Sequence, residues 1–183
     1  DARDISTYSD LNGAIRFKAQ NDEGAQITKG QAVYIKGLAG NGTTPTVGLA
    51  DADDAAKMPA FGIAQNTANN GAEIQIIQVG NLTDIDTSGY NVGDTLYIDT
   101  TAGGLVATPP ATESAKLQNI GRVIRKDGAS GVLMVGGAGR SAATPNLNDG
   151  KIFLGDSNNR SVATALSSIA LSSFNDDLSY QPL

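Results

Sequence analysis

The sequence lacks residue types on which many common active sites depend. None of its 183 residues is histidine, which excludes Ser-His-Asp triads, Cys-His pairs and imidazole metal ligands. None is cysteine, which excludes disulfides, thiolate nucleophiles and zinc-thiolate sites, and leaves the redox compartment undetermined. Stability must therefore come from packing or assembly. We expect no enzyme, no cofactor and no catalytic or metal-binding residues.

Basic clusters and long apolar runs are also missing. The formal net charge is −6, and the densest basic group is Arg122, Arg125 and Lys126, so we expect no nucleic-acid partner. No run of about 18 apolar residues and no basic-then-apolar leader occurs, so we expect neither a membrane partner nor a signal peptide. The chain begins at Asp1 rather than at methionine, and we expect that it was processed or excised from a longer polypeptide.

Turn-forming residues, in contrast, are abundant. The chain has 22 glycines and many Asn, Thr and Ser residues, while 40% of its residues are hydrophobic and only 17% are charged. This composition is typical of short strands joined by frequent turns. At 18.7 kDa the chain is long enough for one compact unit followed by a tail. We therefore predict an all-β protein.

Comparison of the chain with itself indicates an internal duplication. The segment KGQAVYI at residues 29–35 aligns with VGDTLYI at 92–98, and AKMPAFG at 56–62 aligns with AKLQNIG at 115–121. Both matches occur in the same order, with offsets of 63 and 59 residues. The alternative, chance recurrence of a Gly-x-x-x-Tyr-Ile pattern in a β-rich chain, does not explain this shared order.

Each half contains further strand and turn signals. Residues 45–50 and 104–108 are short apolar runs, each followed by a connector, 51–56 or 109–115, that could hold a single helical turn.

Asn-Gly and Asp-Gly turns, at Gly71 and Gly128, then precede strands at 73–76 and 132–135, which indicates a hairpin in each half. Each half is thus expected to contain four short strands, which cannot cover their own apolar face. We therefore predict that the two β-units pack together into one small barrel or sandwich.

The composition and periodicity of the sequence change after Gly139. Residues 140–147 have no periodicity and are typical of a linker, and a short strand is expected at 151–154. The Ser/Asn/Ala-rich remainder, 157–183, fits a weak helix or an extended arm, and alone it would bury too little to be ordered. We predict an N-terminal junction (1–11), a duplicated β-domain (12–139), and a linker with a C-terminal assembly arm (140–183).

Two carboxylate groups could suggest a cation site. Asp84 to Gly89 match the opening of a calcium-binding loop, but the twelfth position is Thr95 instead of glutamate. Asp51, Asp53 and Asp54 crowd together, yet no apolar surroundings would raise a pKa there. We predict a turn in the first case and a solvated connector in the second.

Three other motifs have structural explanations that we prefer. Gly155-Asp156-Ser157 resembles the start of a hydrolase motif but lacks a histidine base, so a tight turn is expected. Residues 136–139 are glycine-rich but lack the Lys-Ser/Thr of a phosphate loop and should mark the exit from the domain. Tyr34 and Tyr97, at equivalent positions of the two halves, are interpreted as packing anchors.

Four segments resemble modules of tailed-bacteriophage virion structural proteins. They are VGDTLYIDTTAGGL at 92–105, IGRV at 120–123, GAGR at 137–140 and PNLNDGKIFLGD at 145–156, and the opening Asp-Ala-Arg also resembles a junction after a preceding module. In that family such modules occur in long tail fibres and in head-decoration proteins. The resemblance implies a β-rich, usually trimeric building block located on the virion.

Three functions follow as hypotheses. The first is a trimeric tail-fibre or surface-fibre module, a homo-oligomer that contacts other virion proteins of the capsid or tail. The second is a capsid decoration (cement) protein that stabilises the head. The third is a carbohydrate- or receptor-binding module that recognises a host-surface glycan through loops 37–44 and 66–71. An enzyme would need a carboxylate pair in a groove, for which Asp84 and Asp86 are the residues to test.

Overall fold

The computed structural model describes residues 14–113, 115–136, 146–157 and 161–169. The chain divides into two units, Asp1–Pro145 and Asn146–Leu183. The predicted domain limits, at residues 11/12 and 139/140, lie outside the described residues. Among the described residues, no helix has the length and apolar composition needed to cross a membrane.

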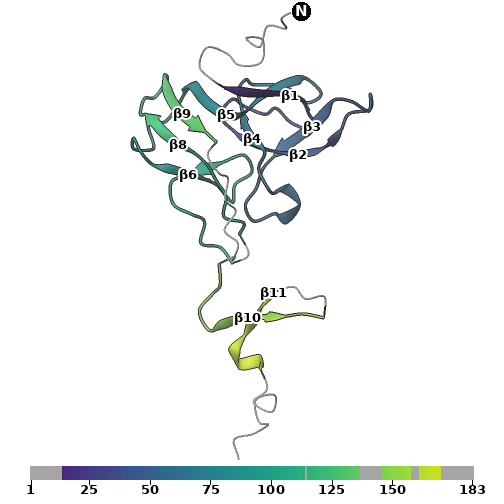
Figure 1. Ribbon diagram of the computed structural model, residues 1–183, viewed down its shortest axis with the longest axis vertical. Helices are drawn as coiled ribbons and strands as arrows, with labels where there is room; N and C mark the ends of the chain where they lie inside the picture. Colours follow the sequence, from purple (N-terminus) through teal and green to yellow (C-terminus); the bar gives the residue numbers. More distant parts are fainter. Residues whose placement is uncertain (1–13, 114, 137–145, 158–160, 170–183) are drawn as a thin grey trace, which may run out of the picture. The chain divides into compact units, whose positions relative to one another are not determined.

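The first half of the larger unit is a closed five-stranded barrel (Figure 1). Its strands are β1 (Ile15–Asn21), β2 (Ala32–Leu38), β3 (Pro45–Leu49), β4 (Gly62–Ala64) and β5 (Glu73–Ile85). They are hydrogen-bonded in the order β1-β3-β2-β4-β5, and β5 pairs back with β1 to close the ring. The one parallel contact among these pairs is β1 with β3. The all-β prediction is confirmed.

The second half continues from the barrel through β5. Its strands are β6 (Thr95–Ile98), β7 (Leu105–Val106), β8 (Asn119–Arg125) and β9 (Gly131–Val135), ordered β5-β9-β8-β6-β7. Figure 1 shows β5 between β1–β4 on one side and β6, β8 and β9 on the other. The barrel therefore shares one long strand with an open sheet.

Strand β5 changes partners at Gly80. Residues up to Val79 pair with β1, and residues from Gly80 onward pair with β9. Gly80 has φ 121°, and a Cβ there would lie 2.5 Å from the Cα of Ala14. Only glycine fits this combination of backbone conformation and close approach, which lets one strand serve both sheets.

Strand pairing confirms the duplication. Val33 of β2 faces Gly62 of β4, and the equivalent Leu96 of β6 faces Gly121 of β8. The turns before β2 and β6 also match, because Gly30 and Gly93 both have φ 94°. The Gly30 amide donates to the Ala64 carbonyl at 2.9 Å, and the Gly93 amide donates to the Val123 carbonyl at 2.8 Å. The offsets of 63 and 59 residues therefore relate structurally equivalent positions.

Each repeat has one strand more than the sequence predicted. The first half of β5 corresponds to β9, and its second half corresponds to β1, since the Phe17–Ile76 pair matches the Leu82–Leu133 pair. The predicted strands at 73–76 and 132–135 lie within β5 and β9, and the strand register makes Ile76 equivalent to Leu133. Neither β1 nor the double use of β5 was predicted.

The connectors of the two halves differ. The first contains a 3-10 helix, η2 (Ala55–Lys57), which confirms the expected helical turn. Of the second, residues 109–113 and 115 are described and contain no helix. Local sequence therefore predicted one connector and not the other.

Alternate residues of the shared strands fill two hydrophobic cores. Within the barrel, the buried residues form the barrel core: Ala19, Ile27, Val33, Val47, Ala64, Ala68, Ile74 and Ile76. Outer residues of β2, β4 and β5 join the second half in a second core that includes Ala32, Ile63, Ile77, Leu82, Leu96, Ile98, Val123, Leu133 and Val135. Because side chains alternate between faces, one barrel wall contributes to both cores.

The smaller unit contains a β-hairpin. Strand β10 (Lys151–Gly155) pairs antiparallel with β11 (Ser161–Ala165), and a 3-10 helix, η3 (Leu166–Ser168), follows. The predicted strand at 151–154 is confirmed. Of residues 157–183, the described segment 161–169 forms a second strand and a short 3-10 turn, and the rest of the predicted helix or extended arm lies outside the described residues, apart from Ser157.

Candidate functional site

The three clustered aspartates shape a turn. Asp54 caps the 3-10 helix η2, where its Oδ1 accepts a hydrogen bond from the Ala56 amide at 3.0 Å. The Lys57 ammonium lies 3.5 Å from Asp54 Oδ2 and 4.0 Å from Asp51 Oδ2. Burial, and then a hydrogen bond with Asp53, raise the pKa of Asp51 above its usual 3.8, so the expectation that nothing in this connector would raise a pKa is wrong for Asp51. The carboxylates thus serve capping and ion pairing.

The segment that matches the opening of a calcium-binding loop is a turn at the end of β5, as predicted. Asp84 adopts φ 58° at a β-bulge, and its Oδ2 accepts a hydrogen bond from the Thr83 hydroxyl at 2.9 Å. Asp86 Oδ1 accepts hydrogen bonds from the Ser88 amide at 2.8 Å and from the Ser88 hydroxyl at 2.6 Å. No group of three or more acidic side chains able to hold a metal occurs in the described part of the chain.

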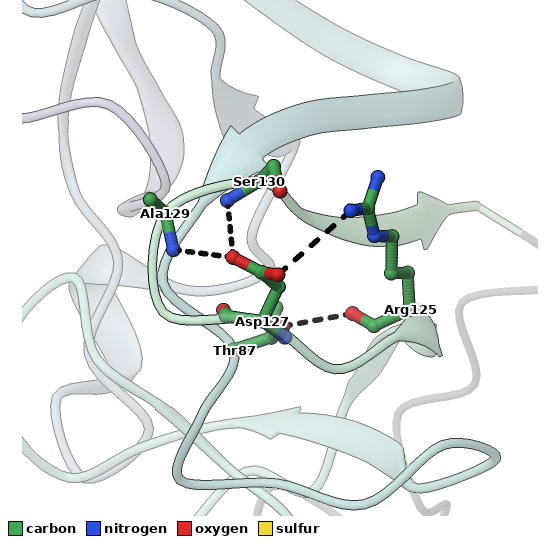
Figure 2. Close-up of polar contacts among 5 residues, drawn as sticks. All are labelled: Thr87, Arg125, Asp127, Ala129 and Ser130. Atoms are coloured by element: carbon green, nitrogen blue, oxygen red, sulfur yellow. Dashed lines mark hydrogen bonds and ion pairs between the residues drawn. The ribbon is translucent and has the colours of Figure 1, made fainter.

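Thr87, at the centre of that loop, joins it to the β8–β9 turn (Figure 2). Its side chain is buried, and its hydroxyl donates to the Arg125 carbonyl at 2.8 Å while accepting from the Asp127 amide at 3.0 Å. The Thr87 amide also donates to the Asp127 carbonyl at 2.9 Å. The loop is therefore fixed by a buried threonine.

Asp127 organises the β8–β9 turn in the same way. Its Oδ1 accepts hydrogen bonds from the Ala129 and Ser130 amides, both at 2.8 Å, as Figure 2 shows. Those amides, Ser130 first, together with the Arg125 guanidinium 3.8 Å away, hold the pKa of Asp127 below its usual 3.8. Hydrogen bonds from the Ser88 hydroxyl and amide likewise lower the pKa of Asp86. Both carboxylates are therefore favoured in the ionised form, in which they accept the hydrogen bonds that stabilise their turns.

The basic residues singled out by the sequence contact polar neighbours. Arg122 donates to the Thr95 hydroxyl at 3.4 Å, and Lys126 donates to the Asn91 amide oxygen at 3.3 Å. Arg125 pairs with Asp127 as described above. Each of the three side chains thus contacts a turn or a neighbouring strand.

The two glycine-containing motifs occupy strand ends, whereas the two tyrosines lie within strands. Gly136 follows β9 with φ 96°, while residues 137–139 lie outside the described residues. Gly155 ends β10, and Asp156 and Ser157 follow it in the hairpin connection. Tyr34 and Tyr97 are half-buried, and Tyr34 packs against the second core.

A polar hollow lies beneath the β2–β3 loop. Its volume is about 550 Å³, and loop residues Asn41, Thr43 and Thr44 face Lys18 and Glu73 of β1 and β5 across it. Lys18 and Glu73 form an ion pair of 3.1 Å. Of the two loops expected to bind a glycan, only 37–44 lines this hollow.

The other loop, 66–71, is tied to residues after β1. The Asn70 side chain accepts a hydrogen bond from the Gly24 amide, and the Asn69 side chain accepts one from Gln26, both at 2.8 Å. Thr67 accepts one from the Lys29 amide at 3.1 Å. The structure therefore does not bring the two loops together in one hollow.

The second half has an open seam, which is a gap between two strand segments whose equivalents are hydrogen-bonded to each other in the first half. Residues Ile85–Asp86 are equivalent to Gln20–Asn21 of the β1–β3 pair, but among the described strands β7 pairs only with β6. Instead, the Tyr90 hydroxyl donates to the Leu105 carbonyl at 2.8 Å. Burial, and then the carboxylates of Asp99 and Asp86, raise the pKa of Tyr90 above its usual 10.0.

Several residues that join distant segments were not found from the sequence, and Tyr90 and Gln118 are among them. The buried Gln118 side chain accepts from the Ala60 amide and donates to the Ala60 carbonyl, both at 2.8 Å. Gln118 aligns with Pro59 in the duplication. This difference between the two repeats is the sequence signal that could have identified Gln118.

The hairpin of the smaller unit has no core of its own. None of its described residues is buried, and Leu154 and Val162, which face each other across the strands, are 39% and 45% exposed. An isolated two-stranded hairpin is marginally stable at best in water. This apolar surface is therefore the strongest candidate for an interaction site.

No protein-family model matches the sequence, and no curated protein matches it significantly.

Proposed function

We propose that this chain is a structural module of a bacteriophage virion, a trimeric part of a tail fibre or surface fibre without catalytic activity. The observation that carries the proposal is the combination of a filled β-barrel, whose strands recur in an adjoining open sheet, with a hairpin that lacks a core. This combination suits a rigid spacer that assembles through its smaller unit. The resemblance of residues 92–105 and 145–156 to phage virion modules supports the same function.

The polar residues of the larger unit support a spacer rather than an active site. Asp54, Asp86 and Asp127 each accept backbone hydrogen bonds within turns. Buried polar groups such as Thr87 and Gln118 bond to backbone of another segment. These side chains hold the fold together, and the interior of the barrel is filled by aliphatic residues.

Labelling of purified virions tests this proposal. Gold-labelled antibodies against the barrel should bind along a fibre of the tail in electron micrographs. Gold confined to the head would instead support the capsid decoration protein, and virions without label would contradict both. Glycan depolymerase activity that is lost in Asp84→Asn or Asp86→Asn variants would contradict the absence of catalysis.

The polar hollow beneath the β2–β3 loop favours a second function, binding of a host-surface glycan. Amide, hydroxyl and charged groups line it, and these groups can hydrogen-bond sugar hydroxyls. Binding on a glycan array should be lost in a Thr43→Arg variant, whose long side chain fills the hollow. A matched variant, Thr101→Arg in another exposed loop, should retain it. Absence of binding by the unchanged protein would contradict this function.

A further inference from the structure

We infer that a hollow between the two repeats of the larger unit is a binding site for a neutral sugar ring. Its volume is about 520 Å³, and it is lined by residues 59–61 and 118–120 together with Gln78, Val79 and Gly136. Ligand pockets commonly have volumes of about 300 to 1,000 Å³. Among the described residues, it shares no lining residue with the hollow beneath the β2–β3 loop, and it does not depend on the virion role.

The duplication brings corresponding segments of the two repeats to this hollow. Residues 59–61 and 118–120 are equivalent, since the offset of 59 residues relates them. Val79 and Gly136 correspond as well, because the strand register of β5 and β9 relates these two positions. The hollow therefore lies where the repeats meet. Boundaries between packed units are preferred places for ligand sites.

Contacts between the repeats fix the walls of the hollow. The buried Gln118 side chain accepts a hydrogen bond from the Ala60 amide and donates one to the Ala60 carbonyl, both at 2.8 Å. A Cβ at Gly136 would lie only 3.1 Å from the Cα of Val79, so the two chain segments touch there. Walls fixed in this way need little ordering when a ligand binds, which lowers the entropic cost of binding.

The first repeat contributes apolar side chains to the hollow. These are Pro59, Phe61 and Val79, of which Phe61 is half-buried and the other two are exposed. The Phe61 ring contacts the Phe17 ring edge to face, with centroids 5.1 Å apart, and it packs against the barrel core. The position of this ring is therefore fixed by the fold. The C–H face of a sugar ring can pack on such aromatic and aliphatic side chains.

Two side-chain amides, those of Gln78 and Asn119, supply polar groups from opposite repeats. A side-chain amide both donates and accepts hydrogen bonds, and a sugar hydroxyl does the same, so the two kinds of group match. None of the described residues that line the hollow is charged. The carboxylate of an acidic sugar would therefore lose water without gaining a counter-ion, which disfavours its binding. A neutral sugar ring fits both the apolar and the amide side chains.

A glycan array probed with the full chain tests the inference. The array carries neutral oligosaccharides of glucose, galactose or mannose beside oligomers of uronic acid and of sialic acid. The unchanged protein should bind at least one neutral oligosaccharide and none of the acidic oligomers. Titration calorimetry with the bound oligosaccharide then compares variants of the full chain.

A Val79→Arg variant should lose binding, because its long side chain fills the hollow. Ile35→Arg is the matched control: Ile35 is also an exposed strand residue, at 41% against 42%, but it does not line the hollow, and binding should be unchanged. Gln78→Leu removes an amide without lengthening the side chain, and the affinity should fall about 2- to 10-fold. Circular dichroism of each variant should retain the β-sheet spectrum, which shows that loss of binding is not loss of fold.

An unchanged protein that binds no neutral oligosaccharide would overturn the inference, as would binding of the acidic oligomers or equal affinities of Val79→Arg and Ile35→Arg. Binding that is lost in Thr43→Arg and retained in Val79→Arg would place the sugar beneath the β2–β3 loop and would overturn it too. Antibody label on the tail without sugar binding would leave the virion role standing. Sugar binding by a chain that is absent from virions would do the reverse.

Discussion

At the scale of single residues, the hydroxyl of Thr87 connects the end of β5 to the turn between β8 and β9. It is one of few polar side chains in a largely aliphatic interior, with 1% of its surface exposed. The backbone groups that it bonds, the Arg125 carbonyl and the Asp127 amide, would otherwise lose their partner. Buried polar groups without partners carry a full desolvation cost.

We expect a Thr87→Val variant to lower the free energy of unfolding by about 1 to 3 kcal/mol, because the isosteric valine leaves those backbone groups unpaired. Urea denaturation measures this difference. A Thr87→Ser variant, which keeps the hydroxyl, should lose less. Equal losses in the two variants would contradict a role for the hydroxyl and point to the methyl group.

Asp127 gives a prediction about pH. Its pKa in the folded chain lies below the usual 3.8, because amides and Arg125 favour the carboxylate. A group with a lowered folded pKa stabilises the fold above its unfolded pKa, and this stabilisation is lost as pH falls through the folded pKa. Asp127→Asn retains an oxygen that accepts the two amides but cannot carry the charge.

The unchanged protein should therefore exceed Asp127→Asn in urea midpoint at pH 7, and the gap should narrow as the pH falls below 3.8. Denaturation series of both proteins across this range provide the measurement. A gap that stays constant with pH would show that ionisation of Asp127 does not contribute.

At the scale of elements, the duplication places two glycines where strands approach closely. A Cβ at Gly62 would lie 2.5 Å from the Ile77 carbonyl oxygen, and one at the equivalent Gly121 would collide with the Met134 carbonyl oxygen. Both clashes are with backbone of the neighbouring strand, which cannot rotate away. The glycine at each of these two positions is thus explained by the close contact between β4 and β5 and between β8 and β9.

Gly62→Ala and Gly121→Ala should each lower the free energy of unfolding by about 1 to 3 kcal/mol through overpacking. Gly128→Ala is the control, because no atom lies within 4 Å of a Cβ at that position. Thermal unfolding followed by circular dichroism compares the three variants. Similar unfolding temperatures for Gly62→Ala and the control would contradict the proposed clash.

At the scale of the larger unit, the barrel and the open sheet share strand β5 and the residues of one barrel wall. Ile77 and Ile63 belong to the barrel strands but pack with Leu96 and Leu133 of the second half. Neither half can lose its structure without exposing part of the other's core. The two repeats should therefore unfold as one cooperative unit.

We test this with one substitution in each core. Ile74→Ala in the barrel core and Leu133→Ala in the second core should each cost about 2 to 5 kcal/mol. Both should shift a single transition, with tyrosine fluorescence and far-ultraviolet circular dichroism coinciding. Two separated transitions, with each substitution shifting only its own, would show that the repeats fold independently.

The sequence by itself determined the β-class, the duplication and most turns of this protein. These follow from local chemistry: glycine and Asn-Gly or Asp-Gly pairs specify turns, and the recurrence of KGQAVYI and AKMPAFG marks equivalent strands. The connector at Asp54 and the strand at 151–154 were likewise local signals. Each depends on neighbours a few residues apart.

Only the tertiary structure decided how the repeats are joined. That β5 belongs to both sheets, that Thr87 and Gln118 bond to backbone of distant segments, and that Tyr90 bridges an open seam all depend on contacts between residues 15 to 64 positions apart. The residue pattern within a strand does not determine with which other strand it pairs. The assignment of the hairpin residues to faces also needed the strand register, because Phe153 and Leu154 are neighbours in sequence and lie on opposite faces only once β10 is paired.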